Sequence, residues 1–402
     1  MTITSLDTLD PRDVGQRLQL ARKARGLTQA DAAEKLGVAR TTLTAIEAGD
    51  RPVKPSELAA LARLYARSIA ELVRRDEPVE PFAVQLRSTL PSRRFSYEDL
   101  EPHVFEFQRL CEDYAAVEKM RDAPLATRYP VPYEIDSSKP ERSGEDVATR
   151  ERHRLGLGDG PIHNLRELLE SDVGLRVFYL DLPSRVAAMY SYTQALGGCI
   201  AVNRRHPAER RRQSLAHDYG HFLTDRYRSE VFLVGRYQRV PAQERFAETF
   251  GRAFLLPESG LSRRFNDLHR ARAGKVTPAD LCVLAHLFFV SVQAMTLRLE
   301  ELDLVPVGTW ERLEQQGFRV REAQSLLGLP PQAETPEALP TRYRYLVAEA
   351  YLSGELSEGQ LARFFRTDRV AARRMIAALE SHSEVSEEGE VSREAVDLAL
   401  PI

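Results

Sequence analysis

The stretch Gln213-Ser-Leu-Ala-His-Asp-Tyr-Gly-His-Phe-Leu223 decides how the middle of the chain folds, and we interpret it as a helix. His217 and His221 lie four residues apart in it. On a helix this spacing places both imidazoles on one face, one turn apart. Two nitrogens in that arrangement can bind one zinc ion. The stretch therefore predicts a helix that carries two ligands of a metal site.

The residue after the first histidine decides which chemistry such a site can perform. In the HExxH signature this residue is Glu, which takes a proton from the metal-bound water. Here the position is occupied by Asp218, whose side chain is one methylene shorter. The carboxylate oxygens of the shorter side chain therefore lie about 1.5 Å further from the position of a metal-bound water. An error of order 1 Å in catalytic geometry can lower the rate about a hundredfold. We therefore expect Asp218 in the place of the catalytic base, with slow or absent hydrolysis.

The length and composition indicate a cytoplasmic protein of several domains. The chain has 402 residues, of which 43% are hydrophobic, and a net charge of −3. No apolar run approaches the roughly 18 residues of a membrane span, and the N-terminus lacks the apolar core of a signal peptide. The cysteines have no metal-type spacing, so we expect them to be reduced and buried. They are Cys111, Cys199 and Cys282.

Residues 1–75 predict a unit of five short helices with a positive net charge. This segment carries thirteen Lys and Arg residues against nine Asp and Glu residues, a net charge of +4 in a chain that is acidic as a whole. Thr28 can cap a helix over residues 29–36 that ends at Gly37, and a further helix covers residues 40–47. Two helices joined by a turn that contains Gly form a helix-turn-helix, whose second helix can enter a DNA major groove.

An ordered set of residues in this segment carries a family resemblance. The set is Leu27-Thr28-Gln29, Ala32-Ala33, Leu36-Gly37-Val38, Arg40-Thr41-Thr42, Ile46-Glu47 and Gly49. In these residues the segment resembles the XRE (Cro/C1-type) DNA-binding domain. The resemblance implies a double-stranded DNA operator as partner, bound by a homodimer; a helical bundle that serves only dimerisation is the alternative. It also implies that five side chains face the DNA: Gln29, Arg40, Thr41, Thr42 and Thr44.

The segment from residue 143 to residue 310 predicts a small domain of mixed structure. Its residue pattern predicts strands over residues 174–180, 186–192 and 199–203. Pro207 then starts the helix that contains the two histidines. We therefore expect a short sheet beside helices.

Residues 143–303 carry a second family resemblance, which extends well beyond the histidine pair. It rests on Leu155-Gly156-Leu157-Gly158, Gly160-Pro161, Leu168-Leu169-Glu170, Gly174-Leu175-Arg176-Val177, Val202-Asn203, His206-Pro207, Glu209-Arg210, Leu215-Ala216-His217 and the run from Glu244 to Pro257. In these residues the segment resembles the ImmA/IrrE family of zinc peptidases. The resemblance implies a zincin-like domain in which Zn²⁺ is held by His217, His221 and a carboxylate from a later helix, with a fourth position open for water. We expect Glu244 to be that carboxylate; Glu248, one turn further on, is the alternative.

Along the whole chain, these patterns predict a mainly α protein with one small α+β domain. We expect a DNA-binding domain at residues 1–75, a linker with an amphipathic helix at 76–142, the zinc peptidase-like domain at 143–310 and a C-terminal helical domain with a second helix-turn-helix-like pair at 311–402. Within the last of these, the acidic run over residues 384–390 predicts a solvated loop.

Together these features predict a bacterial or phage-type transcriptional regulator that binds an operator and carries a zinc-binding HDxxH site. The alternative is an enzyme, a zinc metallopeptidase that cleaves a repressor or antitoxin protein and uses the DNA-binding domain only for delivery. Metal content and a cleavage assay separate the two, because a regulator need not hydrolyse anything.

Overall fold

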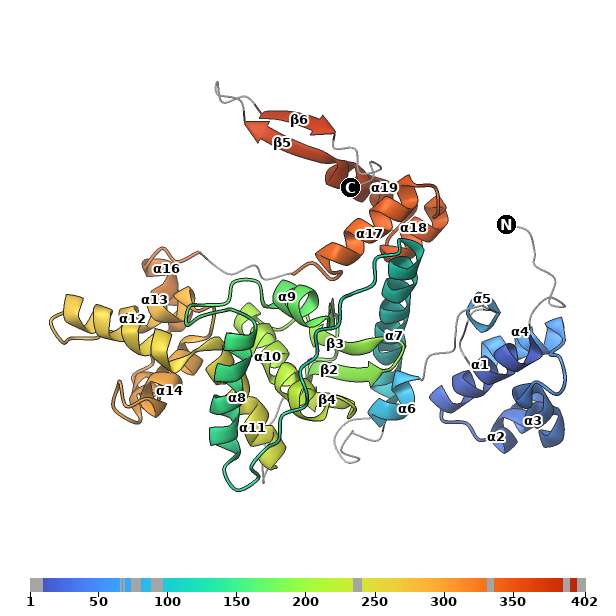
Figure 1. Ribbon diagram of the computed structural model, residues 1–402, viewed down its shortest axis with the longest axis horizontal. Helices are drawn as coiled ribbons and strands as arrows, with labels where there is room; N and C mark the ends of the chain where they lie inside the picture. The colour runs from blue at the N-terminus through green and yellow to red at the C-terminus, as the bar shows by residue number, and fades with distance from the viewer. Residues whose placement is uncertain are drawn as a thin grey trace. The chain divides into compact units, whose positions relative to one another are not determined.

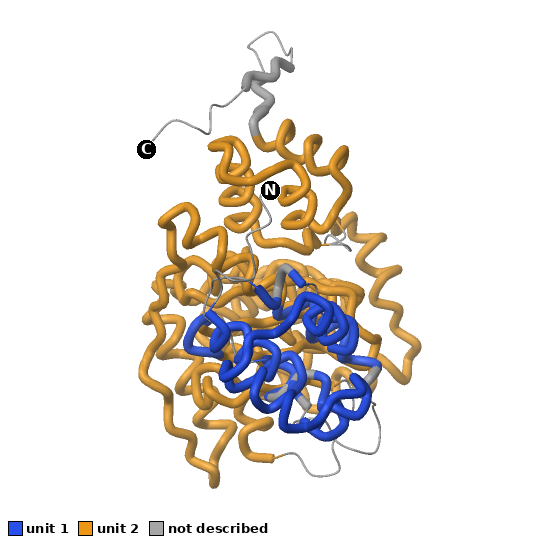
Figure 2. Tube along the Cα trace, turned by 90° about the vertical axis from the view of Figure 1, so that its right-hand side faces the viewer, with its two compact units in different colours: residues 1–108, 193–196 blue, residues 109–192, 197–402 orange. Residues whose placement is uncertain are grey.

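Helices dominate the computed structural model of this chain, and a small sheet lies among them (Figure 1). The predicted fold class, mainly α with a small α+β part, is confirmed. The chain divides into two compact units (Figure 2), which are residues 1–108 with 193–196 and residues 109–192 with 197–402. The structure describes residues 10–65, 67, 69–73, 81–87, 97–233, 241–330, 336–385 and 391–395.

Among its described residues, the first unit begins with the helices that the sequence predicts. The hydroxyl of Thr28 accepts a hydrogen bond from the backbone N–H of Asp31, whose carboxylate accepts one from the backbone of Thr28, and this capping box starts the second helix. That helix ends at Gly37, whose φ of 67° is left-handed. The helices are α1 (Pro11–Ala24), α2 (Gln29–Leu36), α3 (Arg40–Ala48), α4 (Pro55–Leu64) and α5 (Ile69–Leu72).

An apolar core fixes the turn between α2 and α3. Leu18 of α1 and Leu43 of α3 are fully buried in this core. Leu36 and Val38 flank the turn and are partly buried against the same side chains. Because these residues occupy the inner face of α3, the opposite face of that helix is left to carry the polar residues expected to meet DNA.

The predicted linker, residues 76–142, contains helices over much of its described part. α6 covers Phe82–Arg87, and α7 covers Tyr97–Met120, where the sequence predicts an amphipathic helix. Residues 121–139, which follow α7, form neither helix nor strand. Residues 74–80 and 88–96, which include part of the expected linker, lie outside the described residues.

A four-stranded mixed sheet forms the centre of the second unit. Its strand order is β1-β3-β2-β4, with β1 parallel to β3 and β2 antiparallel to β4. The first three strands are the predicted ones. The fourth is not among the predicted strands, because a run of four residues is too short to show a clear period. The strands are β1 (Arg176–Leu180), β2 (Val186–Thr193), β3 (Gly197–Asn203) and β4 (Glu230–Leu233).

Three helices pack side by side next to this sheet and build the region of the histidine pair. α10 (Ala208–Asp225) lies against β3 and against α11 (Ala242–Leu255), and α11 packs in turn along α8 (Pro140–Arg154) (Figure 1). Aromatic side chains fill the contact, where Tyr219 of α10 meets Phe250 of α11 edge-on. α10 is therefore held between the sheet and α11.

Further helices complete the second unit beyond this layer. They are α9 (Leu165–Leu168), the π-helix η2 (Leu169–Val173), α12 (Glu258–Ala271), α13 (Pro278–Leu287), α14 (Val292–Glu301), α15 (Thr309–Gln315) and α16 (Val320–Leu326). Among the described helices, none is by itself long and apolar enough to cross a membrane. Only α13 and α14 taken together reach that length and composition, and the chain bends by 101° between them.

The C-terminal segment is helical at first and then forms a hairpin. The helices are α17 (Thr341–Leu352), α18 (Glu358–Phe364) and α19 (Arg369–Glu380). The expectation of a loop over residues 384–390 is wrong for residues 384 and 385, which belong to β5 (Ser381–Val385), paired antiparallel with β6 (Val391–Ala395). Polar residues outnumber apolar ones in both strands, so no apolar alternation marks them in the sequence. Residues 386–390 lie outside the described residues.

Candidate metal centre and nucleic-acid interface

The two histidines of α10 face each other across one helical turn. Their Nε2 atoms lie 3.0 Å apart, and their ring centroids lie 4.7 Å apart. His217 is 4% exposed and His221 is 9% exposed, so both imidazoles are largely removed from water. Because residues four apart share one face of a helix, the local spacing in the sequence is sufficient to produce this pairing.

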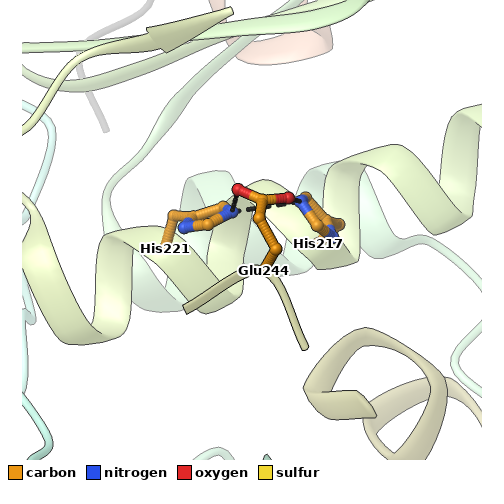
Figure 3. Close-up of side chains that lie close together, drawn as sticks. All are labelled: His217, His221 and Glu244. Atoms are coloured by element: carbon orange, nitrogen blue, oxygen red, sulfur yellow. Dashed lines mark hydrogen bonds and ion pairs between the residues drawn. The ribbon is translucent and has the colours of Figure 1, made fainter. Parts of the chain in front are cut away.

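Glu244, in the first turn of α11, brings a carboxylate to the same point (Figure 3). Its Oε2 atom lies 3.5 Å from Nε2 of His217, and its Oε1 atom lies 3.4 Å from Nε2 of His221. Glu248, the alternative ligand, is exposed on α11 and is not part of the group. Of the two carboxylates expected as third ligand, the structure therefore brings Glu244 to the histidines.

Close packing of α10 on α11 places Glu244 within reach. A Cβ atom at Gly220, between the two histidines, would lie 2.9 Å from Cδ1 of Phe250 and 3.3 Å from Cα of Ala247. On α11, a Cβ atom at Gly251 would lie 3.2 Å from the backbone nitrogen of His217. Side chains at these two positions would push the helices apart, so the short distance between the helices depends on glycine.

The charges of the group favour a carboxylate beside two imidazoles. Burial lowers the pKa of His217, which favours its neutral form. Burial also lowers the pKa of His221, but the hydrogen bond to Glu244 and the negative charges of Glu230 and Glu244 outweigh it, so the net shift is upward. Burial raises the pKa of Glu244, but the hydrogen bonds from both histidines outweigh it and hold that pKa well below its usual range. Glu244 therefore remains ionised at neutral pH.

The three side chains fit the donor set of one tetrahedral zinc ion. One donor atom from each residue lies within 4.8 Å of the other two. Two nitrogens bound about 2.0–2.1 Å from one tetrahedral zinc ion are about 3.3 Å apart. The 3.0 Å between the two Nε2 atoms is close to that value. Three protein ligands leave one position for water or a substrate, as in catalytic zinc sites.

Asp218 is buried next to the group, and its surroundings disfavour its charge. The residue is 3% exposed, and its Oδ2 atom is buried without a hydrogen-bond partner among the described residues. Burial raises the pKa of Asp218 well above its usual range, and the nearby carboxylates of Glu230 and Glu244 add to that shift, while His221 opposes it. A divalent cation would favour the charged form again. Asp218 does not belong to the group of converging donor atoms, so the fit of a cation rests on the chemistry of His217, His221 and Glu244.

Two residues of β4 that sequence reasoning missed also face the histidines. The Oε2 atom of Glu230 lies 3.5 Å from Nδ1 of His221, and the ring centroid of Phe232 lies 4.3 Å from that of His217. Side chains alternate along a strand, so Glu230 and Phe232 share one face while Val231 is buried on the other. No motif marks Glu230 in the sequence. The one signal that could have indicated Glu230 is its place along the chain, between the two helices that carry His217, His221 and Glu244.

In the first unit, the five residues expected to face DNA lie on α2 and α3. Arg40, Thr41 and Thr44 are exposed, and Gln29 and Thr42 are half-buried. Near them the surface has a hollow of about 690 Å³ at the start of α2, lined by Arg22, Lys23, Gly26, Leu27, Thr28, Gln29, Ala30 and Arg40. Positive side chains and the N-terminus of a helix suit the phosphate backbone of a nucleic acid.

A buried ion pair fixes α1 against α3 beneath this surface. Nε and Nη2 of Arg22 donate to the two carboxylate oxygens of Glu47 at 2.6 and 2.8 Å. Glu47 also accepts a hydrogen bond from Nε2 of Gln29 at 3.0 Å, and Oε1 of Gln29 accepts one from the hydroxyl of Thr44 at 3.2 Å. Arg22 is thus structural, and the side chain of Gln29 is oriented by α3.

Two family models match the chain in the order in which the two sites occur. A helix-turn-helix domain matches residues 13–74, and the IrrE N-terminal-like domain matches residues 170–300. None of the curated proteins compared with this chain matches it.

Solved structures show only a weak likeness. The structure of Bacillus thuringiensis PlcR in complex with the peptide PapR7 and DNA is 13% identical, covers 92% of this chain and 96% of its own, and has a TM-score of 0.17. The structure of ComR from Streptococcus suis is 12% identical, covers 91% of this chain and 87% of its own, and has a TM-score of 0.16. At such scores neither structure informs the arrangement or the function of this chain.

The two family matches agree with the two resemblances found in the sequence. The first match contains the turn between α2 and α3, and the second contains the sheet and all three residues of the candidate metal group. The chain therefore combines an XRE-like helix-turn-helix domain with an IrrE N-terminal-like domain, which is the composition of a DNA-binding regulator.

Proposed function

We propose that this protein is a DNA-binding transcriptional regulator whose IrrE N-terminal-like domain holds one Zn²⁺ ion through His217, His221 and Glu244. The observation that carries the proposal is the convergence of these three side chains from two helices, in a chain that also has a helix-turn-helix domain. The donor set, two imidazoles and one ionised carboxylate, is one that zinc prefers.

For the DNA, we propose that α3 enters the major groove with Arg40, Thr41, Thr42 and Thr44, while Gln29 reaches the DNA from the start of α2. The guanidinium of Arg can bind guanine and the amide of Gln can bind adenine, each through two hydrogen bonds. A homodimer would present two such helices to half-sites about one turn of DNA apart.

For the metal, we propose binding and sensing rather than efficient hydrolysis. A bound zinc ion would supply Lewis-acid chemistry and lower the pKa of a coordinated water. Hydrolysis also needs a carboxylate that takes a proton, and Asp218 stands in that place. The side chain of Asp218 is one methylene shorter than that of Glu, and this shorter reach opposes the role.

Operator selection tests the DNA part of the proposal. The full-length protein should select a defined site from random DNA fragments. Gln29→Ala and Thr42→Ala should weaken its preference for that site, since each mismatch at a recognised base pair is typically worth about 1–3 kcal/mol. Gln316→Ala, which removes an exposed glutamine from the second unit, is the matched control. Full-length protein that selects no sequence even at low salt contradicts the proposal.

Asp218→Glu separates the regulator from the alternative, a zinc metallopeptidase that cleaves a repressor or antitoxin. If only the reach of the carboxylate limits hydrolysis, the longer side chain should raise cleavage by about tenfold to a hundredfold. If the protein is a regulator, Asp218→Glu should leave the metal content and the operator binding unchanged and should show no protease activity. Wild type, Asp218→Glu and Asp218→Ala are incubated with candidate repressors and antitoxins, and fragments are followed by mass. Fast wild-type cleavage that disappears in Asp218→Ala would favour the enzyme.

The division into domains is also a proposal. We propose functional segments at residues 1–75, 76–142, 143–310 and 311–402, whereas the two compact units meet at residues 108 and 109, inside α7. Limited proteolysis of the full chain tests the division, and first cuts within α10 or α11 would contradict it.

A further inference from the structure

β4 lies next to both histidines of the candidate metal group, although no motif in the sequence marks it. It pairs with β2 in a register that sets Glu230 opposite Tyr190 and Val231 opposite Met189. This pairing turns the carboxylate of Glu230 toward α10, where it is 25% exposed. The strand is therefore a wall of the site, and its first residue is a carboxylate.

The two ring nitrogens of His221 have different neighbours. Nε2 lies 3.0 Å from Nε2 of His217 and 3.4 Å from Oε1 of Glu244, which makes it the nitrogen on the metal side. Nδ1 lies 3.5 Å from Oε2 of Glu230. An imidazole that binds a metal through Nε2 carries its proton on Nδ1, and that proton needs an acceptor.

We propose that Glu230 is a positioning residue for the metal group. Its carboxylate accepts the Nδ1–H of His221, which fixes the tautomer and the ring orientation so that Nε2 faces the metal position. The proposal rests on the proposed function, because it assigns Glu230 a role only if His217, His221 and Glu244 bind a metal ion.

The geometry assigns Glu230 this role rather than that of a fourth ligand. The donor atoms of His217, His221 and Glu244 converge, and Glu230 does not belong to that group. Its oxygen lies beside Nδ1 of His221, the nitrogen that is not on the metal side. Asp218, the other extra carboxylate, has a buried oxygen without a hydrogen-bond partner among the described residues. Glu230 is thus the carboxylate placed to orient a ligand.

The test is the zinc affinity of the full-length protein at one fixed pH. Zinc is removed with a chelator, and affinity is measured by competition with a chromophoric chelator. Glu230→Ala should weaken binding by about 10–100-fold, the usual effect of removing the partner of a ligating histidine. Glu230→Gln should weaken binding less, because its amide oxygen still accepts a hydrogen bond. Glu248→Gln, which alters an exposed carboxylate on α11, should bind as wild type does.

Two further readouts separate positioning from a merely structural role and from ligation. Urea unfolding of the metal-free proteins should give similar stability for wild type and Glu230→Gln, so that the loss of affinity is specific to the bound state. The visible spectrum of bound Co²⁺ should keep its band positions in Glu230→Gln, because the ligand set is unchanged. A shift of these bands would make Glu230 a ligand and overturn the proposal.

The outcomes also separate this proposal from the proposed function. If the wild type binds zinc and Glu230→Ala binds within about twofold of it, the positioning role is wrong and the zinc site stands. If the wild type takes up no zinc after reconstitution, both are wrong. A graded loss from Glu230→Gln to Glu230→Ala with an unchanged Co²⁺ spectrum is the expected result.

Discussion

Replacing Gly220 by alanine should decide whether close packing of α10 on α11 builds the candidate metal group. In an open helix, alanine in place of glycine stabilises by about 1 kcal/mol. Here the added Cβ would lie 2.9 Å from Cδ1 of Phe250 and 3.3 Å from Cα of Ala247. Overpacking of this kind costs about 1–3 kcal/mol. The two effects predict a net loss of about 0–2 kcal/mol in the free energy of unfolding.

The same substitution should also weaken zinc binding. The strain can be relieved by a small shift of α11, and α11 carries Glu244. Zinc must then draw Glu244 back against the new methyl group, which costs affinity. We expect a loss of up to about tenfold, equivalent to 1.4 kcal/mol.

Urea unfolding in the presence of a chelator measures the first effect, and competition titration with zinc measures the second. Gly359→Ala on α18 is the matched control, because its added Cβ would meet only the end of the Arg369 side chain at 3.6 Å. That control should stabilise the protein by about 0.4–1 kcal/mol and leave zinc binding unchanged. If Gly220→Ala stabilises as much as Gly359→Ala and binds zinc equally well, close packing of α10 on α11 does not build the metal group.

Two other substitutions test charges that the fold has buried. Glu47→Gln leaves the guanidinium of Arg22 buried without its counter-charge and should destabilise the helix-turn-helix domain by about 3 kcal/mol. Thermal melting measures this loss of stability, and a loss below about 1 kcal/mol would argue against a buried ion pair. Burial raises the pKa of Asp218, so its stabilising contribution is present below its unfolded pKa of about 3.9 and is lost as the pH rises through the folded value. In the presence of a chelator, the free energy of unfolding of Asp218→Asn should therefore rise relative to that of the wild type as the pH is raised from 4 to 8. A difference between the two proteins that does not change with pH would refute the raised pKa of Asp218.

The part of the site that could be predicted from the sequence is the part encoded locally. The spacing of His217 and His221 fixes their relation on a helix whatever surrounds them. The choice between Glu244 and Glu248 is different, because it depends on which turn of α11 meets α10. That contact is set by Gly220 and Gly251, whose effect becomes visible only when the two helices are packed together.

Contacts between distant segments could not be predicted in the same way. Glu230 reaches His221 because β4 pairs with β2, and a strand of four residues shows too little periodicity to predict that pairing. Arg22 and Glu47 are separated by 25 residues, and in the sequence both look like ordinary surface charges. The hairpin of β5 and β6 is held by backbone pairing that a polar sequence does not show.

The zinc content of the purified full-length protein shows whether His217, His221 and Glu244 hold a metal ion. After reconstitution and removal of free metal, elemental analysis should find about one zinc ion per chain in the wild type. The content should fall to background when His217 and His221 are both replaced by alanine, and it should fall strongly in Glu244→Gln. Gln316→Ala should retain the ion. A wild type that holds no zinc, or a double histidine variant that retains all of it, would contradict the assignment of His217, His221 and Glu244 as the metal site.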